Sequence, residues 1–259
     1  MFKLLKDISY FKTEEAELIE VKSDDGSFTA YSKEYDEHYH STKDGALKES
    51  YQKHVIPAFL ALGCKEEVAI LDICYGLGFN TLCTLLYYKE NSPTTKLRIY
   101  SPELDASLIK SLKSFTYPKE FDSLKEIIIR LSEENIYEDE NLYIEIFLGD
   151  AREYVRRFKD KFDIVYQDAF SPSANPMLWT QEYFSDIKRS MKQEAVLTTY
   201  SMALKTRLAL YENDFNIYIN SADDIRDATV ASLEKLSIFK EVNMQHKIAC
   251  NPDIKSLRD

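Results

Sequence analysis

The sequence predicts an α/β fold around a doubly wound, mostly parallel sheet of about seven strands. Three observations support this prediction. Short apolar runs alternate with helical stretches between residues 68 and 220, which is typical of parallel strands joined by crossover helices. The first run ends at Asp72 and is followed by Gly76 and Gly78, where a tight turn leads into a helix. Acidic residues also follow the later runs, at the sheet edge where such folds bind ligands.

The elements are expected in the following order. A helix over residues 46–62 contains Pro57, which indicates a kink or a restart. Hydrophobic periodicity predicts strands at 68–73, 97–101, 143–148, 162–167, 195–200 and 215–220, and a last strand near 245–249. Helices are expected at 79–89, 151–158, 180–191 and 203–211, with a mostly helical insertion over 105–141. Residues 1–45 are expected to form an N-terminal extension or cap, and residues 46–259 the sheet domain.

The composition is that of a folded globular protein. Of the 259 residues, 44% are hydrophobic and 4 are cysteines without a CxxC pair, so nothing in their spacing suggests zinc or a disulfide framework. No apolar run approaches the ~20 residues of a membrane span, and the first fifteen residues lack the features of a signal peptide. We therefore expect a cytoplasmic protein without membrane attachment. The net charge of -11 argues against a broad polyanion-binding surface but leaves a local basic patch open.

The glycine turn after the first strand predicts a nucleotide-like ligand. Gly76 and Gly78 allow the backbone to approach a ligand closely, and the next helix presents free N–H groups there. A dinucleotide-binding turn has a third glycine where this sequence has Thr81. A ligand with an amino-acid tail therefore fits better than a pyrophosphate, and Asp72 is expected to attract its ammonium group. The alternative is an ordinary strand-to-helix turn.

The second and third strands end in residues suited to a nucleoside. Glu103 and Asp105 follow the second strand, where a carboxylate accepts both hydroxyls of a ribose. We expect Glu103, the first of the two, in this role. Asp150, between Gly149 and Ala151, is expected to accept from an adenine amino group and to cap the next helix. The alternatives are a solvated acidic loop and a simple helix cap.

The fourth strand leads into the most distinctive segment of the chain. An acid, aromatic residues and prolines follow one another closely: DAFSP at 168–172, NP at 175–176 and WT at 179–180. An acid at a strand end, followed by a proline-stiffened loop, suits a group held at the centre of the sheet edge. The alternative is a capped loop with core aromatic residues. Together, the four strand ends describe a nucleoside with an aminoacyl tail beside an acidic site, which is the shape of S-adenosylmethionine.

These segments resemble the methyltransferase half of the MnmC-type tRNA wobble-uridine modification enzymes. The resemblance extends over residues 31–232 and is carried by Tyr39-His40-Ser41, Gly45-Ala46 and Glu49, by LDICYGLGFNT, by the DAFSP, NP and WT strings, by Thr199-Tyr200-Ser201, and by Arg226 with 229–232. The DAFSP-to-WT element is the most specific part. Bifunctional members also carry an FAD-dependent oxidase domain, for which 259 residues leave no room. A stand-alone methyltransferase is therefore expected.

The resemblance implies a Rossmann-like class I methyltransferase fold and a reaction. The reaction is N-methylation of 5-aminomethyl-uridine, often 2-thiolated, at the wobble position of tRNA. S-adenosylmethionine is the implied cofactor, and the tRNA anticodon stem-loop is the implied partner. No metal is required, because the sulfonium methyl group is already activated. The oligomeric state does not follow from the sequence.

The implied site residues fall into three groups. Those for the cofactor are Asp72, Gly76, Gly78, Asn80, Glu103, Asp150, Ala151 and Asp168. Those for catalysis are Asp168, Phe170 and Pro172, whose loop is expected to orient the amine. Those for the substrate are Tyr39, His40, Glu49, Trp179 and Tyr200. Phe170, Trp179 or Tyr200 is expected to stack on a flipped-out uracil.

Three other interpretations share part of these features. Aminopropyl transferases of the spermidine synthase type place a similar string after the fourth strand, but their glycine run is richer. A nicotinamide-dependent oxidoreductase is disfavoured by the missing third glycine. A non-catalytic RNA-binding or scaffold protein is disfavoured by the intact acidic strand ends.

Overall fold

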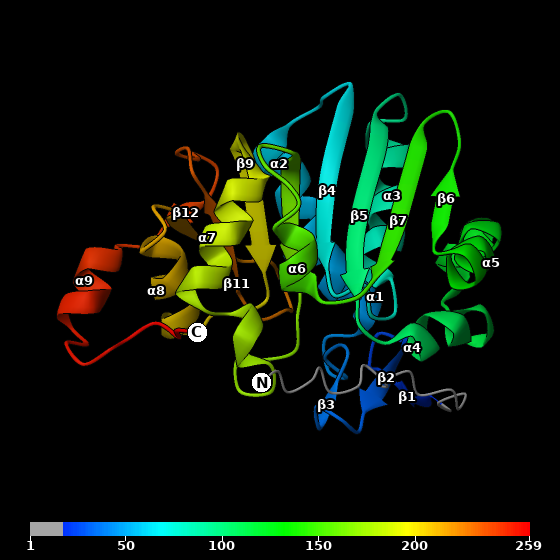
Figure 1. The fold of residues 1–259 in the computed structure, drawn as a ribbon, viewed down its shortest axis with the longest axis horizontal. Coiled ribbons are helices and arrows are strands. Elements are labelled where there is room, and N and C mark those ends of the chain that lie inside the picture. Colours follow the sequence, from blue (N-terminus) through cyan, green and yellow to red (C-terminus); the bar gives the residue numbers. More distant parts are fainter. Residues whose placement is uncertain (1–17) are drawn as a thin grey trace, which may run out of the picture.

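The structure is a computed structural model that describes residues 18–259. The expectations for residues 1–17, including the lack of a signal peptide, lie outside this range. A central sheet dominates the fold (Figure 1). In spatial order its strands are β12 (Lys240–Glu241), β10 (Asn216–Asn220), β11 (Ala228–Ser232), β9 (Met191–Thr199), β8 (Phe162–Gln167), β4 (Glu67–Ile73), β5 (Lys96–Glu103), β7 (Leu142–Leu148) and β6 (Ile136–Glu138).

The centre of this sheet is parallel, and its two margins are antiparallel. β9, β8, β4, β5 and β7 pair in parallel, in that order. β11 pairs antiparallel with both β9 and β10, and β6 pairs antiparallel with β7. The strand order reverses direction between β4 and β8, which is where a doubly wound sheet opens a ligand crevice. The predicted α/β fold is confirmed.

Two helical layers cover the sheet. One layer holds α1 (Ala46–Glu49), η1 (Ser50–Val55), α2 (Ile56–Leu62), α3 (Phe79–Asn91), α4 (Ala106–Ser111), η2 (Leu112–Ser114), η3 (Lys119–Leu124) and α5 (Lys125–Glu134). The other holds α6 (Ala151–Val155), α7 (Gln181–Ser190) and α8 (Leu204–Tyr211), with α9 (Met244–Ala249) packed beside them. A short turn, η4 (Pro176–Leu178), precedes α7.

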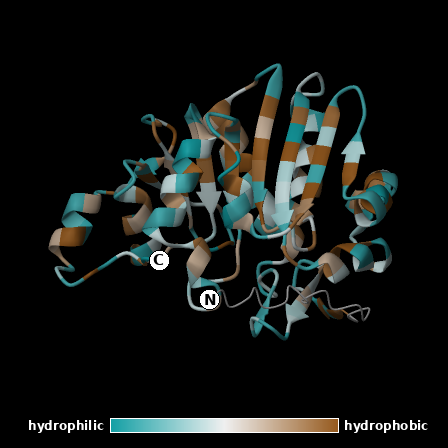
Figure 2. Cartoon of the chain, viewed as in Figure 1, coloured by the Kyte–Doolittle hydropathy of each residue, from teal (hydrophilic) through white to brown (hydrophobic). Residues whose placement is uncertain are grey.

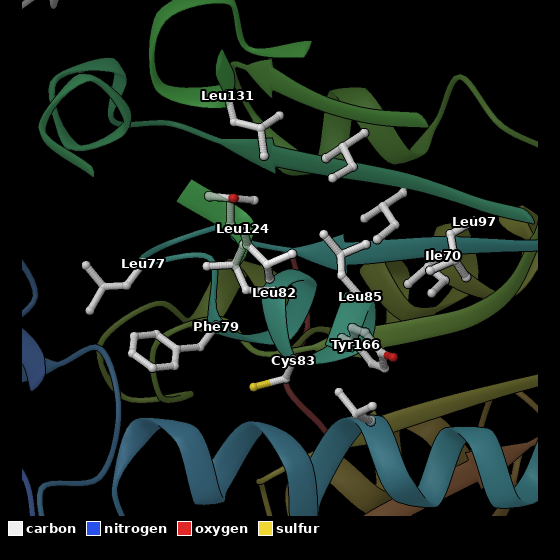
Figure 3. Close-up of a cluster of buried hydrophobic side chains, with 14 of the residues drawn as sticks. Ile70, Leu77, Phe79, Leu82, Cys83, Leu85, Leu97, Leu124, Leu131 and Tyr166 are labelled. Carbon is white, nitrogen blue, oxygen red and sulfur yellow. The ribbon is translucent and has the colours of Figure 1, made fainter. Parts of the chain in front are cut away.

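The core consists of the apolar faces between these layers. Figure 2 shows hydrophobic residues concentrated on the central strands and hydrophilic residues on the connecting turns. On one face, Ile70 of β4 and Leu97 of β5 pack against Leu82 and Leu85 of α3 (Figure 3). Burial of such side chains contributes about 1.5–3 kcal/mol each to stability. This packing holds in place the strands whose ends carry the predicted site.

A small antiparallel sheet forms a cap at one end of the central sheet. Its strands are β1 (Ile19–Lys22), β2 (Phe28–Ser32) and β3 (Glu37–His38). Figure 1 shows it at the end toward which the arrowheads of β5 and β9 point. It therefore lies over the carboxyl ends of the parallel strands.

Several elements differ from the sequence-based expectation. The central sheet has nine strands among the described residues, not about seven. Ala228–Ser232 is a fully buried strand that the prediction lacked; β-branched Thr229 and Val230 suit its place between β9 and β10. The strand expected near 245–249 is instead helix α9, which Asn243 caps by accepting from the His246 N–H. Ile136–Glu138, expected within the helical insertion, is an edge strand.

Candidate active site

One large cavity lies between the cap and the carboxyl ends of the strands. Its volume is about 2350 Å³. Its walls come from five places in the fold. They are the loop between β4 and α3 that carries Gly76 and Gly78 (the glycine loop), the segments at the ends of β5, β7 and β8, and the cap strands β2 and β3. This volume exceeds what a single small ligand needs. The cavity therefore has room for a nucleoside cofactor and part of a second substrate.

The glycine loop forms the floor of this cavity. Gly76 and Gly78 have φ of 54° and 76°, and Gly78 lies in the left-handed region directly before α3. Gly76 lines the cavity and donates its N–H to Glu103 Oε2 over 2.9 Å. Gly78 lies one layer below, where an added Cβ would come within 2.7 Å of the Tyr75 hydroxyl. The two glycines thus have different roles: Gly76 lines the cavity, and Gly78 allows the turn into α3.

Replacing Gly78 by alanine is expected to destabilise the fold by about 1–2 kcal/mol through backbone strain, with a further loss from the Tyr75 contact. The measurement is the free energy of unfolding in urea. Gly26→Ala is the control, because Gly26 also has a positive φ, 87°, but an added Cβ there meets nothing within 4 Å. Equal losses in both variants would show that the Tyr75 contact is unimportant.

Asp72 lies beneath the glycine loop. Its side chain is buried and accepts from the Thr81 hydroxyl over 2.8 Å and from Asn80 Nδ2 over 3.5 Å. Burial raises the pKa of Asp72 to about 7, and the negative charge of Asp168 adds to this. Asp72 does not line the cavity, and its carboxyl group supports the start of α3 through Thr81 and Asn80. Its contact with a ligand ammonium group stays a prediction.

The residues at the ends of β5 and β7 do line the cavity. They are Glu103, Asp150 and Ala151. Glu103 accepts the N–H groups of Gly76, Leu104 and Asp105 at 2.8–2.9 Å, and burial raises its pKa. Asp150 caps α6 by accepting from Glu153 N over 2.9 Å with one oxygen. Each carboxylate keeps further acceptor positions, so both remain suited to the hydroxyl and amino groups of a nucleoside.

Asp168, directly after β8, lines the cavity and contacts two other side chains. Asn80 Nδ2 donates to its Oδ2 over 2.8 Å, and His54 Nε2 lies 3.4 Å from its Oδ1. Burial alone would raise the pKa of Asp168, but the charge and N–H of His54, with the amide of Asn80, lower it to about 2. The pKa of Asp72 therefore lies well above that of Asp168, although Asn80 contacts both.

The loop after Asp168 is held in place by side chains from other elements. Tyr200 donates its hydroxyl to Ala169 O over 3.0 Å, and Trp179 Nε1 donates to Phe170 O over 2.8 Å. From the cap, Glu37 accepts both the N–H and the hydroxyl of Ser171. The backbone of this loop is thus fixed from three sides.

Two residues expected at the substrate lie away from the cavity wall. Trp179 is fully buried and does not line the cavity, and its indole supports the loop. Pro172 does not line the cavity either. Phe170 and Tyr200 do line it, but the Phe170 ring already stacks on Tyr35 of the cap with centroids 4.5 Å apart.

The cap supplies the predicted substrate residues Tyr39 and His40. Both line the cavity, and the Tyr39 ring lies 5.0 Å from that of Phe170, between ring centroids. His40 is 8% exposed, and burial lowers its pKa although Asp168 opposes this effect. Its Nδ1 is buried without a hydrogen-bond partner among the described residues. Such an atom is ready to bind a polar group of a ligand.

Glu49 lies at the margin of the cavity and fastens the cap to the helical layer. One oxygen accepts from Ser41 N over 2.8 Å, and the other binds Lys53 Nζ at 2.7 Å. Lys53 also binds Asp44 at 3.0 Å, and all three side chains are buried. The sequence interpretation placed Glu49 at the substrate; the structure shows its carboxylate engaged within the protein.

Sequence reasoning missed His54 altogether. It lies inside the 46–62 stretch, where its neighbours Val55 and Ile56 read only as part of an apolar helix face. The segment 50–55 is π-helical, a form that is frequent at functional sites but has no reliable sequence signature. Its contact with Asp168 joins positions 114 apart in the chain, so no local pattern reveals it.

Two negative findings apply to residues 18–259. No cluster of three or more histidine, cysteine, aspartate or glutamate side chains there has a metal-binding arrangement. No helix in that range combines the length and apolar character that crossing a bilayer requires.

Comparison with known proteins assigns the family. A family model described as S-adenosyl-L-methionine-dependent methyltransferase matches residues 119–233. The crystal structure of MnmC2 from Aquifex aeolicus is similar over 95% of this chain and 80% of that one, with 30% identity and a TM-score of 0.81. The chain belongs to the MnmC-type methyltransferase family. S-adenosylmethionine is its cofactor, and the expected Rossmann-like class I methyltransferase fold is confirmed.

Curated relatives extend the comparison. An uncharacterised protein of Methanocaldococcus jannaschii is 30% identical over 76% of this MnmC-type chain and 54% of its own length. A protein of Leptospira interrogans named as the tRNA 5-methylaminomethyl-2-thiouridine biosynthesis bifunctional protein MnmC is 26% identical over 74% of this chain and 31% of its own length. The chain thus spans about half of the first relative and a third of the second.

One neighbour bears on the aminopropyl transferase alternative. Spermidine synthase from Thermotoga maritima superposes with a TM-score of 0.51 over 93% of this chain, at 18% identity. Similarity at this level reflects a shared fold and does not transfer an activity.

Proposed function

We propose that this chain methylates the amino nitrogen of 5-aminomethyl-uridine or its 2-thio form at the wobble position of tRNA, in the anticodon stem-loop. The names of the bifunctional relatives support a tRNA thiouridine pathway. The observation that carries the proposal is Asp168, an acid at the cavity wall whose pKa is lowered by His54 and by Asn80, which belongs to the helix after the glycine loop. A negative group at this place suits an amine that becomes cationic during the reaction.

The cavity fits the cofactor. Asn80 Oδ1 is buried and has no hydrogen-bond partner among the described residues, and Asn80 lines the cavity beside Gly76. Glu103 and Asp150 add acceptors at the neighbouring strand ends. We propose that Asn80 and the glycine loop hold the aminoacyl tail, Glu103 the ribose, and Asp150 with Ala151 the adenine. The acceptor-rich set matches the ammonium, hydroxyl and amino groups of that molecule.

The protein's part in the reaction concerns the amine and its proton. When bound, S-adenosylmethionine supplies an electrophilic methyl group: the nitrogen lone pair forms the new N–C bond, the C–S electron pair stays on sulfur, and the positive charge moves to nitrogen. Asp168 accepts an N–H bond of the amine and so aims its lone pair. The same carboxylate stabilises the cationic product by its negative charge, and the extra proton of the ammonium group passes to water.

The remaining cap and loop residues complete the proposed substrate site. Tyr39, Phe170 and Tyr200 line the cavity next to Asp168, and an uracil ring that leaves the anticodon stack needs such aromatic surfaces. The Phe170 side chain must part from Tyr35 before it can cover a base. His40 also lines this cavity, and its buried Nδ1 has no hydrogen-bond partner among the described residues.

The proposed function is tested by methyl transfer from labelled S-adenosylmethionine to bulk tRNA that lacks this modification, followed by nucleoside analysis. Labelled 5-methylaminomethyl-uridine, thiolated or not, is the expected product. A parallel reaction contains putrescine and decarboxylated S-adenosylmethionine. Formation of spermidine in that reaction, with no label in tRNA, would make the chain an aminopropyl transferase. Cofactor binding with neither product would favour a non-catalytic protein.

The RNA contacts are expected at the rim of the cavity. Lys33 and Lys43 of the cap and Arg226 of the turn between β10 and β11 are exposed and line the cavity. Arg226→Glu is expected to raise the KM for tRNA several-fold at unchanged kcat, and to reduce the slope of log KM against log salt by about 1. Lys159→Glu, the same charge change before the start of β8, is the control. Equal effects of both substitutions would point to net charge alone.

A further inference from the structure

The side chain of His54 lies behind Asp168 and is fully buried. Its Nε2 is 3.4 Å from Asp168 Oδ1, and its Nδ1 is 3.0 Å from Thr198 Oγ1 on β9. The first distance is longer than an ordinary hydrogen bond, and Nε2 has no hydrogen-bond partner among the described residues. Catalytic hydrogen bonds are often long before substrate binds and shorten in the complex.

The surroundings of His54 select one tautomer. If Nδ1 carried the proton, the lone pair of Nε2 would face the Asp168 carboxylate, which is repulsive. If the Thr198 hydroxyl donates to Nδ1, the proton lies on Nε2 and faces Asp168 Oδ1. The hydrogen bond at one ring nitrogen thus determines whether the other nitrogen donates or accepts a hydrogen bond.

We propose that His54 is a positioning residue, which donates Nε2–H to Asp168 Oδ1 and thereby directs the carboxylate toward the substrate amine. This proposal rests on the proposed function. Asn80 holds the other oxygen, Oδ2, at 2.8 Å. With one donor on each oxygen, from two different helical elements, the carboxylate cannot rotate about its bond to Cβ. One lone pair on each oxygen remains for the N–H groups of the amine.

His54 and its neighbour Lys53 both belong to the π-helical segment η1. Lys53 and His54 are adjacent and both buried. Lys53 binds the acids Asp44 and Glu49, whereas His54 faces Asp168. One short segment thus fastens the cap and orients the reactive carboxylate. The cap and the reaction centre are therefore mechanically linked through these two neighbours.

The other titratable groups near His54 bear on how the site responds to pH. The charges of Asp72 and His40 act on the same site, from β4 and the cap. Tyr166 of β8 presents its ring at 75° to the imidazole, with centroids 5.8 Å apart. Among the acids of residues 18–259, Asp168 alone contacts the imidazole. Removing His54 is therefore expected to act chiefly on Asp168.

The first test is spectroscopic and needs no cofactor. The chain has four histidines, so ¹⁵N labelling of histidine gives a simple long-range ¹H–¹⁵N spectrum, and His54→Gln identifies the His54 signals. We expect Nε2 to carry a proton at neutral pH. The Nδ1–H tautomer would overturn the proposal. This result does not depend on whether tRNA is the substrate.

The second test is the pH profile of methyl transfer to tRNA. His54→Phe keeps a ring but loses the donor, and misplacement of Asp168 is expected to lower kcat by up to about 100-fold with little change in KM for S-adenosylmethionine. In wild type, log(kcat/KM) is expected to rise with a slope of about 1 at acid pH, from the substrate amine. In the variant the pKa of Asp168 is raised because the His54 donor is lost. Both the substrate amine and Asp168 must then lose a proton before reaction, so the slope approaches about 2.

Matched variants separate positioning from a merely structural role. His54→Gln, whose amide N–H can reach Asp168, is expected to recover much of the activity and the wild-type slope. His246→Phe, the same substitution at an exposed position on α9, is expected to leave both unchanged. A His54→Phe protein whose activity falls by one factor at every pH would overturn the proposal. Inactive wild type would instead reject the proposed function.

Discussion

Replacing Asp168 by asparagine is expected to lower kcat for tRNA methylation by about 10²–10⁴. Asparagine keeps the shape of the side chain and one acceptor oxygen. It carries no charge to stabilise the methylated ammonium group. It also presents an NH₂ group either to Asn80 Nδ2 or to His54 Nε2, both of which lie against Asp168. The measurement is kcat and KM for tRNA, together with calorimetric affinity for S-adenosylhomocysteine.

The control for this prediction is Asp160→Asn. Asp160 is an exposed residue before the start of β8, at the other end of the sheet, and its replacement is expected to leave kcat unchanged. Cofactor affinity of the Asp168 variant is expected to change much less than kcat. Normal turnover by a folded, cofactor-binding Asp168→Asn protein would remove Asp168 from the mechanism.

The second large effect is expected on stability, from Lys53→Met. Lys53 joins Asp44 and Glu49, and the three side chains are 5–9% exposed. Removing the ammonium group leaves two buried carboxylates without a counter-charge, which costs about 3–5 kcal/mol. Because Glu49 also holds Ser41 N, the cap is expected to loosen first. Urea unfolding measures the loss, and proteolysis within the cap locates it.

The pH dependence of this loss has a definite sign. Burial lowers the pKa of Lys53, but Glu49 and Asp44 outweigh burial, so the pKa is raised. The stabilisation by Lys53 is therefore fully present below about pH 10.5 and is lost only as pH rises further. The variant lacks this ammonium group. Its deficit relative to wild type is thus expected to shrink as pH rises above about 10.5, where wild type loses the same stabilisation.

Two further variants make this prediction specific. Lys113→Met removes an ion pair with Glu133 in which both side chains are about half exposed, and its cost is expected to stay below about 1 kcal/mol. Adding Asp44→Asn and Glu49→Gln to Lys53→Met removes the unpaired charges and is expected to restore part of the stability. If the triple variant is no more stable than Lys53→Met, the loss comes from packing and not from buried charge.

The parallel centre of the sheet could be predicted because its determinants are local. β4 and β8 are short apolar strands buried along nearly their whole length, and such runs followed by helices favour a parallel arrangement. The acids Glu103, Asp150 and Asp168 occupy the residues at or just after strand ends. Because parallel strands end at one edge of the sheet, their convergence on one cavity followed from strand direction alone.

The margins of the sheet were harder to predict. β11 has small and β-branched residues that are buried on both faces, but nothing in its own sequence states that it lies between β9 and β10. The residues of Met244–Ala249 alone do not distinguish a strand from a helix. The N-cap at Asn243 is the feature that favours the helix. Edge elements depend on the surface they pack against, and local propensity is too weak to decide them.

The sequence by itself determined the sheet's parallel core, the glycine turn and which strand ends carry acids, since each depends on residues close in the chain. Only the tertiary structure decided what those acids do. Asp72 and Asp168 are both strand-end aspartates, yet burial raises the pKa of one to about 7 while His54 and Asn80 lower that of the other to about 2. His54 contacts Thr198 across 144 positions, and Glu37 contacts Ser171 across 134. Charge state depends on neighbours and on distance from water, and folding brings those neighbours together from separate parts of the chain.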